Sequence, residues 1–245
     1  MAKPEPRPHT ILVTGATDGI GLWLAKSYAG RGHKVLATGR QAIADDAAFF
    51  GASNIAYVRA DQSAPDEAAT RIAAAMAGLG WQQLDLGILN AGLGWAGDPA
   101  DEPVAEIERQ IAVNFTANVL ITKALAPWLF IGKGRLAIIG STAHTGAKGF
   151  ATYAATKAAM AGFAKSLRSE WQGRAEVTLV HPGPTRTSMH HKAGLSLGAV
   201  RAMFMSTKRA GKSIEKSIRK GDDTRKLSRT FGWRSAMSNP KEFQL

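Results

Sequence analysis

Residues 10–29 read TILVTGATDGIGLWLAKSYA, and this stretch decides the fold class. The run from Ile11 to Thr14 is short and apolar, which is typical of a buried strand. Three glycines follow it, and the apolar residues after them recur three and four positions apart, as on one face of a helix. A glycine-rich turn between a strand and a helix lets the backbone approach a diphosphate at the positive end of the helix. A tight turn with close helix–sheet packing would use the same spacing.

Further short apolar runs alternate along the chain with Ala-rich segments of helical length. Strands joined by helix-length crossovers form parallel sheets that are covered on both faces. We therefore predict an α/β fold, a doubly wound, Rossmann-like parallel sheet in a single domain over residues 1–245, with the presence of a last, seventh strand left open. The predicted strands are 11–14, 34–38, 54–58, 84–89, 135–139 and 176–180. Residues 1–9 are expected to form a flexible leader, 188–206 a substrate lid and 207–245 a basic C-terminal segment, with a short helix at 207–220.

Composition narrows the classes of protein. The 245 residues include no cysteine, which excludes a disulfide framework, a thiolate zinc site and a cysteine nucleophile and favours a reducing compartment, hence the cytoplasm. The longest apolar stretch, Val119 to Ile131, contains Lys123 and Pro127 and is shorter than the roughly 20 residues of a membrane span. We therefore expect no membrane partner.

Positive charge is concentrated near the end of the chain. The formal net charge is +12, and residues 201–245 hold 12 Lys and Arg against 4 Asp and Glu, a net charge of +8. Such a surface could attract nucleic acid, an anionic substrate or an acidic carrier protein. It could also be an ordinary solvated surface without a binding role.

Polar residues follow several predicted strands. Arg40 comes after the second strand. In a dinucleotide-binding fold, an arginine there suits a 2′-phosphate on the adenosine ribose, whereas an acidic residue would suit the free ribose hydroxyl. Asp61 follows the third strand and Asn90 the fourth, and ligands of open sheets bind at such carboxyl ends. Each of the three could also be an ordinary surface or loop residue.

Tyr153 and Lys157 stand four residues apart in a run of good helix formers, so both lie on one helix face. A phenol has an ordinary pKa of about 10, and a neighbouring ammonium together with a nicotinamide charge would lower it toward the range of an acid–base catalyst. Ser141 ends the fifth strand, where its hydroxyl could hold a substrate oxygen. Asn114 precedes the helix that leads to this strand. The Tyr–Lys pair alone could also be a chance pairing on an amphipathic helix.

Taken together, TGATDGIG at 14–21, NAG at 90–92, Asn114, Ser141, YxxxK at 153–157 and PGPTRT at 182–187 resemble the short-chain dehydrogenase/reductase family. The resemblance covers about residues 10–190. It implies an NADP(H)-dependent oxidoreductase that transfers a hydride between nicotinamide and a carbonyl or secondary alcohol of a small, partly apolar substrate.

The resemblance also implies roles for single residues. Tyr153 would be the general acid/base, and Lys157 would lower its pKa and bind the nicotinamide ribose. Ser141 would orient the carbonyl or alcohol, and Asn114 would hold a water in the proton relay. Arg40 implies NADP(H) in preference to NAD(H), although Asp18 counts against it, because many NADP-preferring relatives have a basic or neutral residue there. The implied cofactor-binding residues are Gly15, Thr17, Asp18, Gly19, Ile20, Gly21, Arg40, Asp61, Gln62, Asn90, Ala91, Gly92, Tyr153, Lys157, Pro182, Gly183, Thr185 and Thr187.

Substrate, metal and partners are less strongly indicated. Candidate substrate residues by position are Trp95, His144, Phe150 and Met189. No metal is expected, since the adjacent His190 and His191 lack a third ligand at a recognisable spacing. The helices that carry Asn114 and Tyr153 form a common interface in the family, and the small, apolar run 151–164 favours a homodimer, or a homotetramer.

Two further hypotheses concern the basic segment. In one, the protein is a nucleotide-fold sensor or a nucleic-acid binder that uses the basic segment. The segment has few aromatic residues on which bases could stack, which counts against nucleic-acid binding. In the other, it is a reductase of ketoacyl groups linked to a carrier protein or to coenzyme A.

Overall fold

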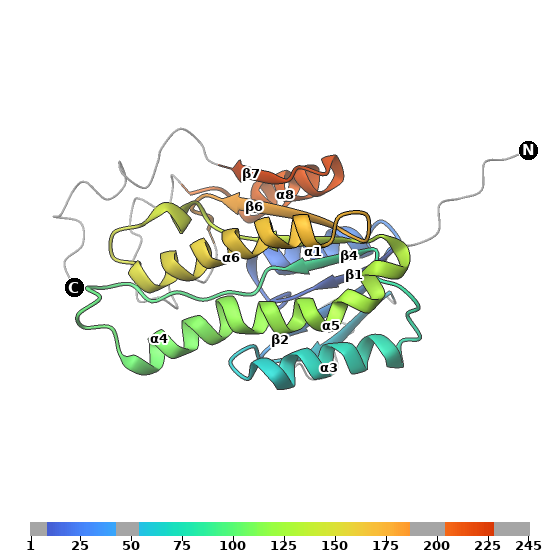
Figure 1. Ribbon diagram of the computed structural model, residues 1–245, viewed down its shortest axis with the longest axis horizontal. Helices are drawn as coiled ribbons and strands as arrows, with labels where there is room; N and C mark the ends of the chain where they lie inside the picture. Colours follow the sequence, from blue (N-terminus) through green and yellow to red (C-terminus); the bar gives the residue numbers. More distant parts are fainter. Residues whose placement is uncertain (1–8, 43–53, 187–203, 228–245) are drawn as a thin grey trace, which may run out of the picture.

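A seven-stranded parallel sheet with the strand order β3-β2-β1-β4-β5-β6-β7 runs through the molecule (Figure 1). The computed structural model describes residues 9–42, 54–186 and 204–227. All six predicted strands are confirmed. The strands are β1 Thr10–Val13, β2 Lys34–Gly39, β3 Ile55–Arg59, β4 Leu86–Leu89, β5 Arg135–Ile139, β6 Glu176–Pro182 and β7 Thr224–Leu227.

Helices cover both faces of this sheet (Figure 1). One layer contains α3 Pro65–Gly78, α4 Val104–Ile111, the π-helical turn η1 Ala112–Thr116, α5 Ala117–Gly132 and α6 Ala151–Glu170. The other contains α1 Gly19–Ala29 and α8 Thr207–Lys220, which contact one another. A short 3₁₀ turn, η2 Thr142–Thr145, joins β5 to α6. The predicted α/β fold, a Rossmann-like parallel sheet wound in both directions, is therefore confirmed.

Alternation along the strands explains why each face needs a helical layer. Leu12 packs in the core beneath α3, α5 and α6, whereas its neighbours Ile11 and Val13 pack in the core beneath α1 and α8. Successive strand residues point to opposite faces, so an entirely apolar strand has to be buried on both. This is the physical basis of the pattern seen in the sequence.

The sheet also has a seventh strand, which the sequence left open. β7 pairs in parallel with β6, and Leu179 lies opposite Thr224 in the register. The predicted helix 207–220 is confirmed as α8, with Ile214 and Ile218 buried against the sheet. Glu215 of α8 also forms an ion pair with Arg31 after α1, 2.5 Å between nitrogen and oxygen. Residues 207–227 of the basic segment are thus part of the sheet and its helical layer.

A short bridge fastens the chain between β6 and α8. Thr185 pairs in parallel with Met205, the amide of Met205 donates to the carbonyl of Pro184 at 2.9 Å, and the amide of Arg186 donates to the carbonyl of Met205 at 2.9 Å. The predicted leader, apart from His9, and most of the predicted lid, residues 188–203, lie outside the described residues.

The helical stretch from Val104 to Gly132 is 29 residues long and by length and composition could cross a membrane. The apolar run from Val119 to Ile131 in the sequence was too short for this. The helix in the structure is longer, because it begins at Val104 and continues past Lys123 and Pro127. In the fold, α5 packs on the sheet with Ile121, Leu125 and Leu129 fully buried. The core helix of a soluble protein can have the same length and composition, so these two properties are weak evidence for a membrane span.

Candidate active site

The strand order reverses between β1 and β4, and the glycine turn follows β1 at this point. Open α/β sheets bind ligands outside the carboxyl ends of the strands where the order reverses. Gly15 has a φ of 62° and Gly19 a φ of 58°, in the left-handed region that favours glycine. A Cβ on Gly21 would fall against the carbonyl oxygen of Gly15. The turn therefore requires glycine and sits directly on the amino end of α1.

Side-chain hydrogen bonds hold this turn to the end of β4. The hydroxyl of Thr14 accepts from the amides of Asn90 and Ala91, at 3.0 and 3.1 Å. In return, the side-chain amide of Asn90 donates to the carbonyls of Thr14 at 3.0 Å and Gly15 at 3.2 Å. The Asn-Ala-Gly sequence thus fixes the loop that would carry a diphosphate.

Asp18 caps α1. Its carboxylate accepts from the amide of Gly19 at 2.5 Å, where a negative charge also interacts favourably with the helix dipole. The residue that counted against NADP(H) in the sequence therefore has a structural role at this helix end.

Two arginines meet beyond β2. Arg40 is exposed, and Arg59, at the end of β3, donates from Nε to the carbonyl oxygen of Arg40 at 3.2 Å. Parallel pairing places Gly39 opposite Arg59, which brings the second cation to the edge where the sequence pointed only to Arg40. Arg59 could have been found as the last residue of a strand that pairs beside β2.

Ser141, Tyr153 and Lys157 come together at the carboxyl end of β5. All three are buried. The ammonium of Lys157 donates to the carbonyl of Ile139 at 3.1 Å and lies 5.7 Å from the centre of the Tyr153 ring. The hydroxyl of Ser141 accepts from the amide of Ala143 at 3.1 Å and is hydrogen-bonded with Tyr153. The helical spacing of Tyr153 and Lys157 thus does place them at one site.

The electrostatics of this group differ from the sequence expectation. Burial raises the pKa of the Tyr153 phenol, and the hydrogen bond from Ser141 partly offsets this. Burial likewise lowers the pKa of Lys157 to about 8. The sequence predicted that the ammonium would lower the phenol pKa; in the cofactor-free chain desolvation is the larger effect, because it disfavours the charged form of either group. Tyr153 therefore stays protonated at neutral pH.

Asn114 lies in the π-helical turn η1 and is completely buried. Its side chain pairs with the backbone of Leu93, accepting from the amide at 2.9 Å and donating to the carbonyl at 2.8 Å, and also donates to Thr156 at 3.1 Å. The side chain of Asn118 donates to the main-chain carbonyl of Asn114 at 2.8 Å. Asn114 thus ties the loop after β4 to the helix that carries Tyr153 and Lys157.

That loop passes close to Asn114, Tyr153 and Lys157. A Cβ on Gly92 would lie 3.2 Å from the Asn114 amide oxygen and 3.2 Å from the Lys157 ammonium. A Cβ on Gly94 would lie 3.2 Å from the Tyr153 ring. Small residues here allow the backbone to approach the site closely.

Comparison with known proteins places this arrangement. Residues 9–197 match the family model described as short chain dehydrogenase. The chain belongs to the short-chain dehydrogenase family. Membership of this family is what the resemblance in the sequence implied.

Relatives of this short-chain dehydrogenase include an 11-beta-hydroxysteroid dehydrogenase 1A of Arabidopsis thaliana, 34% identical over 71% of the chain; the chain spans about half of that relative, 51% of its length. It is also 34% identical to an NADP-dependent 3-hydroxy acid dehydrogenase of Salmonella typhi, over 71% of each chain. A solved structure of serine dehydrogenase complexed with NADP⁺ is similar with a TM-score of 0.79 and 25% identity, and covers 91% of this chain and 98% of that one.

The remaining predicted residues of this short-chain dehydrogenase occupy varied places. Gln62 is buried and donates to the carbonyl of Val113 at 3.2 Å, while Asp61 accepts from the amide of Ser63 at 3.0 Å. The hydroxyl of Thr185 donates to the carbonyl of Gly183 at 2.9 Å. Thr187 and Met189 lie outside the described residues, as do His190 and His191. Over residues 9–42, 54–186 and 204–227, no three His, Asp or Glu side chains gather as a metal site would.

The candidate substrate residues differ in how they could face a ligand. Phe150 is buried and packs edge-on against the ring of Tyr153, with 6.1 Å between ring centres. Trp95 and His144 are both partly exposed. The amide of Trp95 donates to the side chain of Gln110 at 3.3 Å.

Sequence reasoning missed a buried carboxylate beside this loop. Glu102 accepts from the side-chain nitrogen of Gln110 at 2.5 Å and from the hydroxyl of Thr152 at 2.6 Å. Gln110 in turn accepts from the amide of Trp95, so a chain of hydrogen bonds connects the start of α6 to the loop after β4. The sequence carries no signal for it, because its members lie up to 57 residues apart.

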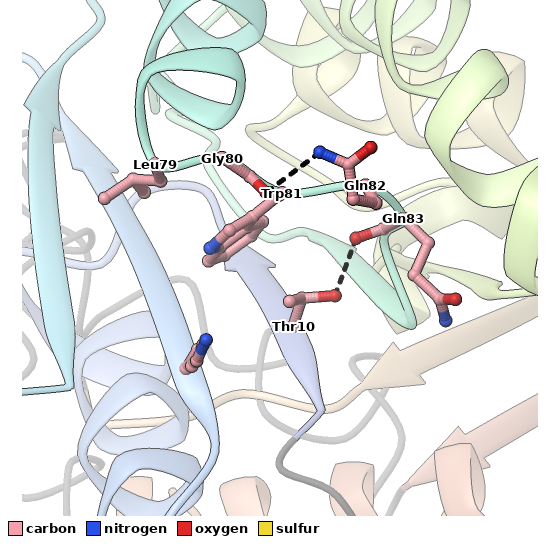
Figure 2. Close-up of a pocket in the computed structure, with 7 residues that line it drawn as sticks. Thr10, Leu79, Gly80, Trp81, Gln82 and Gln83 are labelled. Carbon is pink, nitrogen blue, oxygen red and sulfur yellow. Dashed lines mark hydrogen bonds between the residues drawn. The ribbon is translucent and has the colours of Figure 1, made fainter.

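A hollow on the opposite edge of the sheet is separate from this site. It is lined by Leu79–Gln83 together with Thr10 and Lys34, at the amino ends of β1 and β2 (Figure 2). The hydroxyl of Thr10 donates to the carbonyl of Gln83 at 2.8 Å across its floor (Figure 2). Ligands of such folds bind at the carboxyl ends, so this hollow is not part of the candidate active site.

Proposed function

We propose that this chain is an NADP(H)-dependent carbonyl reductase or alcohol dehydrogenase with Tyr153 as its general acid/base. The observation that carries the proposal is the convergence of Ser141, Tyr153 and Lys157, all buried, at the carboxyl end of β5. This edge also holds the glycine turn.

The donor set fits a dinucleotide. The glycine turn at the amino end of α1 suits a diphosphate, and the cations of Arg40 and Arg59 suit a 2′-phosphate by charge-assisted hydrogen bonds. The ammonium of Lys157 would hold the ribose of the nicotinamide. When bound, such a cofactor supplies or accepts the hydride.

Tyr153 handles the proton. With its pKa raised by burial, the phenol is protonated at neutral pH and can donate to a carbonyl oxygen as that oxygen gains negative charge during reduction. The hydroxyl of Ser141 would orient that oxygen. The buried ammonium of Lys157 stabilises the phenolate that remains, since an opposite charge favours the charged form.

Relatives of known name support a small substrate that carries a hydroxyl or carbonyl group. One is an NADP-dependent 3-hydroxy acid dehydrogenase and another a serine dehydrogenase complexed with NADP⁺. For this chain we propose a small, partly apolar ketone or secondary alcohol. A cytoplasmic location and a homodimer or homotetramer remain predictions; α6 exposes the small residues Ala151, Ala155, Ala158 and Ala159 for such an interface.

A second candidate substrate is a ketoacyl group linked to an acidic carrier or to coenzyme A. Lys208, Lys212, Lys216 and Lys220 are all exposed at a spacing of four on α8, opposite the buried Ile214. A ketone-reduction assay with a coenzyme A thioester as competitor separates the two: inhibition supports the linked substrate, and an unchanged rate supports a free ketone. The same stripe leaves nucleic-acid binding as a lesser alternative, which steep salt dependence of binding would support.

Tyr153→Phe tests the catalytic proposal. We expect turnover of a ketone with NADPH to fall by orders of magnitude while NADPH affinity changes little, since only the phenol proton is lost. Tyr28→Phe is the matched control, because Tyr28 is buried in the core beneath α1 and α8. Normal turnover in Tyr153→Phe would refute the proposal.

Arg40→Ala tests cofactor choice. Thermal-shift titrations should show greater stabilisation by NADPH than by NADH, and the variant should lose that difference because its 2′-phosphate partner is gone. Arg71→Ala, an exposed arginine paired with Glu67 on α3, is the control. A larger shift with NADH in the unsubstituted protein would contradict the assignment.

A further inference from the structure

The carbonyl oxygen of Ser141 is held by two histidine rings from separate parts of the chain. Nδ1 of His144, in η2, lies 2.7 Å from this oxygen, and Nδ1 of His181, in β6, lies 2.9 Å from it. The amide of His144 also donates to the same oxygen, at 3.1 Å. Both side-chain contacts thus converge on the peptide of the serine at the active site.

The chemistry of the acceptor fixes the state of both rings. A carbonyl oxygen only accepts hydrogen bonds, so Nδ1 of His144 and Nδ1 of His181 must each carry a proton. In a neutral ring with this tautomer, Nε2 is the nitrogen without a proton. The tautomer therefore follows from the geometry and can be measured.

Packing gives the pair little freedom. The two rings stack with 3.8 Å between their centres and 20° between their planes. His181 is only 1% exposed, and a Cβ on Gly140 would lie 2.6 Å from its Nδ1. Glycine at 140 therefore makes room for the ring beside the end of β5.

Burial, helped by nearby charges, keeps His181 neutral. Burial first, and then the neighbouring His144, lower the pKa of His181 to about 4, and Lys226 and Lys157 act in the same direction, while the hydrogen bond with Ser141 opposes them. These groups come from η2, β7 and α6, the elements that face the ring. At neutral pH His181 consequently stays in its uncharged, Nδ1-protonated form.

We propose that His144 and His181 are positioning residues that fix the Ser141 peptide and, through it, the direction of the Ser141 hydroxyl toward Tyr153. This inference rests on the proposed function. Residues 139–141, at and just after the end of β5, hold both Lys157 and the two histidines. The carbonyl of Ile139 accepts from the Lys157 ammonium, and the carbonyl of Ser141 accepts from the two rings. A change in the Ser141 peptide would therefore turn its hydroxyl away from the phenol.

The two histidines should affect the chemical step through Ser141. We expect His144→Leu and His181→Leu each to lower kcat for ketone reduction about tenfold, as the loss of one hydrogen bond in the transition-state arrangement predicts, with NADPH affinity changed less than twofold. His144→Asn and His181→Asn keep a donor near the Nδ1 position and should recover most of the rate. His33→Gln, at the opposite edge of the sheet, is the control.

A double-mutant cycle with Ser141→Ala distinguishes positioning from general packing. Once the hydroxyl is absent its direction no longer matters, so each leucine substitution should change the remaining kcat less than twofold in the Ser141→Ala background. Assays at high enzyme concentration follow this slow turnover, and thermal unfolding checks that each variant folds. His144 is only partly buried, so its variants keep the test available if the His181 variants do not fold.

Other results would overturn the inference. Equal tenfold losses in both backgrounds, or no loss from either leucine substitution, overturn the positioning role while the proposed function stands. Nitrogen-15 NMR of the unsubstituted protein at neutral pH should show a proton on Nδ1 of both rings; an Nδ1 without a proton on either ring also overturns it. If the unsubstituted protein reduces no ketone with NADPH or NADH, the proposed function fails as well.

Discussion

Replacing Lys157 by methionine should make the cofactor-free protein more stable at neutral pH. The pKa of Lys157 falls from 10.5 to about 8 on burial, a shift of about 2.5 units at 1.36 kcal/mol each, or about 3 kcal/mol. The folded state binds this proton less tightly than the unfolded state. The destabilisation is therefore fully present below pH 8 and is relieved as the pH rises from about 8 to 10.5.

A non-titrating side chain of similar size removes this pH dependence. By the same linkage relation, the destabilisation due to Lys157 falls from about 3 kcal/mol at pH 7 to about 1 kcal/mol at pH 9.5. The advantage of Lys157→Met over the unsubstituted protein should therefore shrink by about 2 kcal/mol between these pH values. Turnover should be lost in the variant, as expected where function requires a buried charge.

Urea unfolding of both proteins at pH 7, 8, 9 and 9.5, without cofactor, measures this difference. Lys165→Met is the matched control, because Lys165 lies on the same helix with its side chain exposed. Curves for Lys157→Met and the unsubstituted protein that run parallel across this range would refute the reasoning. So would an advantage for the variant that grows with pH.

Two other substitutions test the surroundings of the site. Glu102→Ala leaves the donors of Gln110 and Thr152 without their acceptor, so the free energy of unfolding in urea should fall by about 2 kcal/mol or more. The KM for the ketone should rise as well, because the loop after β4 is held less firmly. Unchanged stability would contradict this. Gly21→Ala forces a methyl group against the carbonyl of Gly15, so NADPH titrated by its fluorescence should bind at least tenfold more weakly, and affinity equal to that of the unsubstituted protein would show that the turn does not hold the diphosphate.

The strands of the sheet could be predicted because their apolar runs are unbroken and helical segments separate them. β7 could not, since Thr224, Arg225 and Lys226 are exposed and only Leu227 is partly buried. Its strand conformation follows from pairing with the edge of β6, a tertiary effect that overrides local preference. The basic residues that suggested a separate tail are thus partly a sheet edge.

Helical spacing correctly placed Tyr153 and Lys157 on one face, but it says nothing about burial. The degree of desolvation depends on the elements that pack around the pair, and this is why the raised pKa of the phenol was not foreseen. His181 was missed for a related reason. Its partner, Ser141, is 40 residues away in sequence, and only the pairing of β5 with β6 brings the two together.

The bridge between Thr185 and Met205 holds together the two positions between which residues 187–203 run in the sequence. Because Thr185 and Met205 pair with one another, a change in the length or composition of 187–203 need not disturb the register of β6 and β7. Since 188–206 is predicted to be a substrate lid, we expect that exchanging residues 187–203 for the corresponding segment of a relative changes the substrate preference.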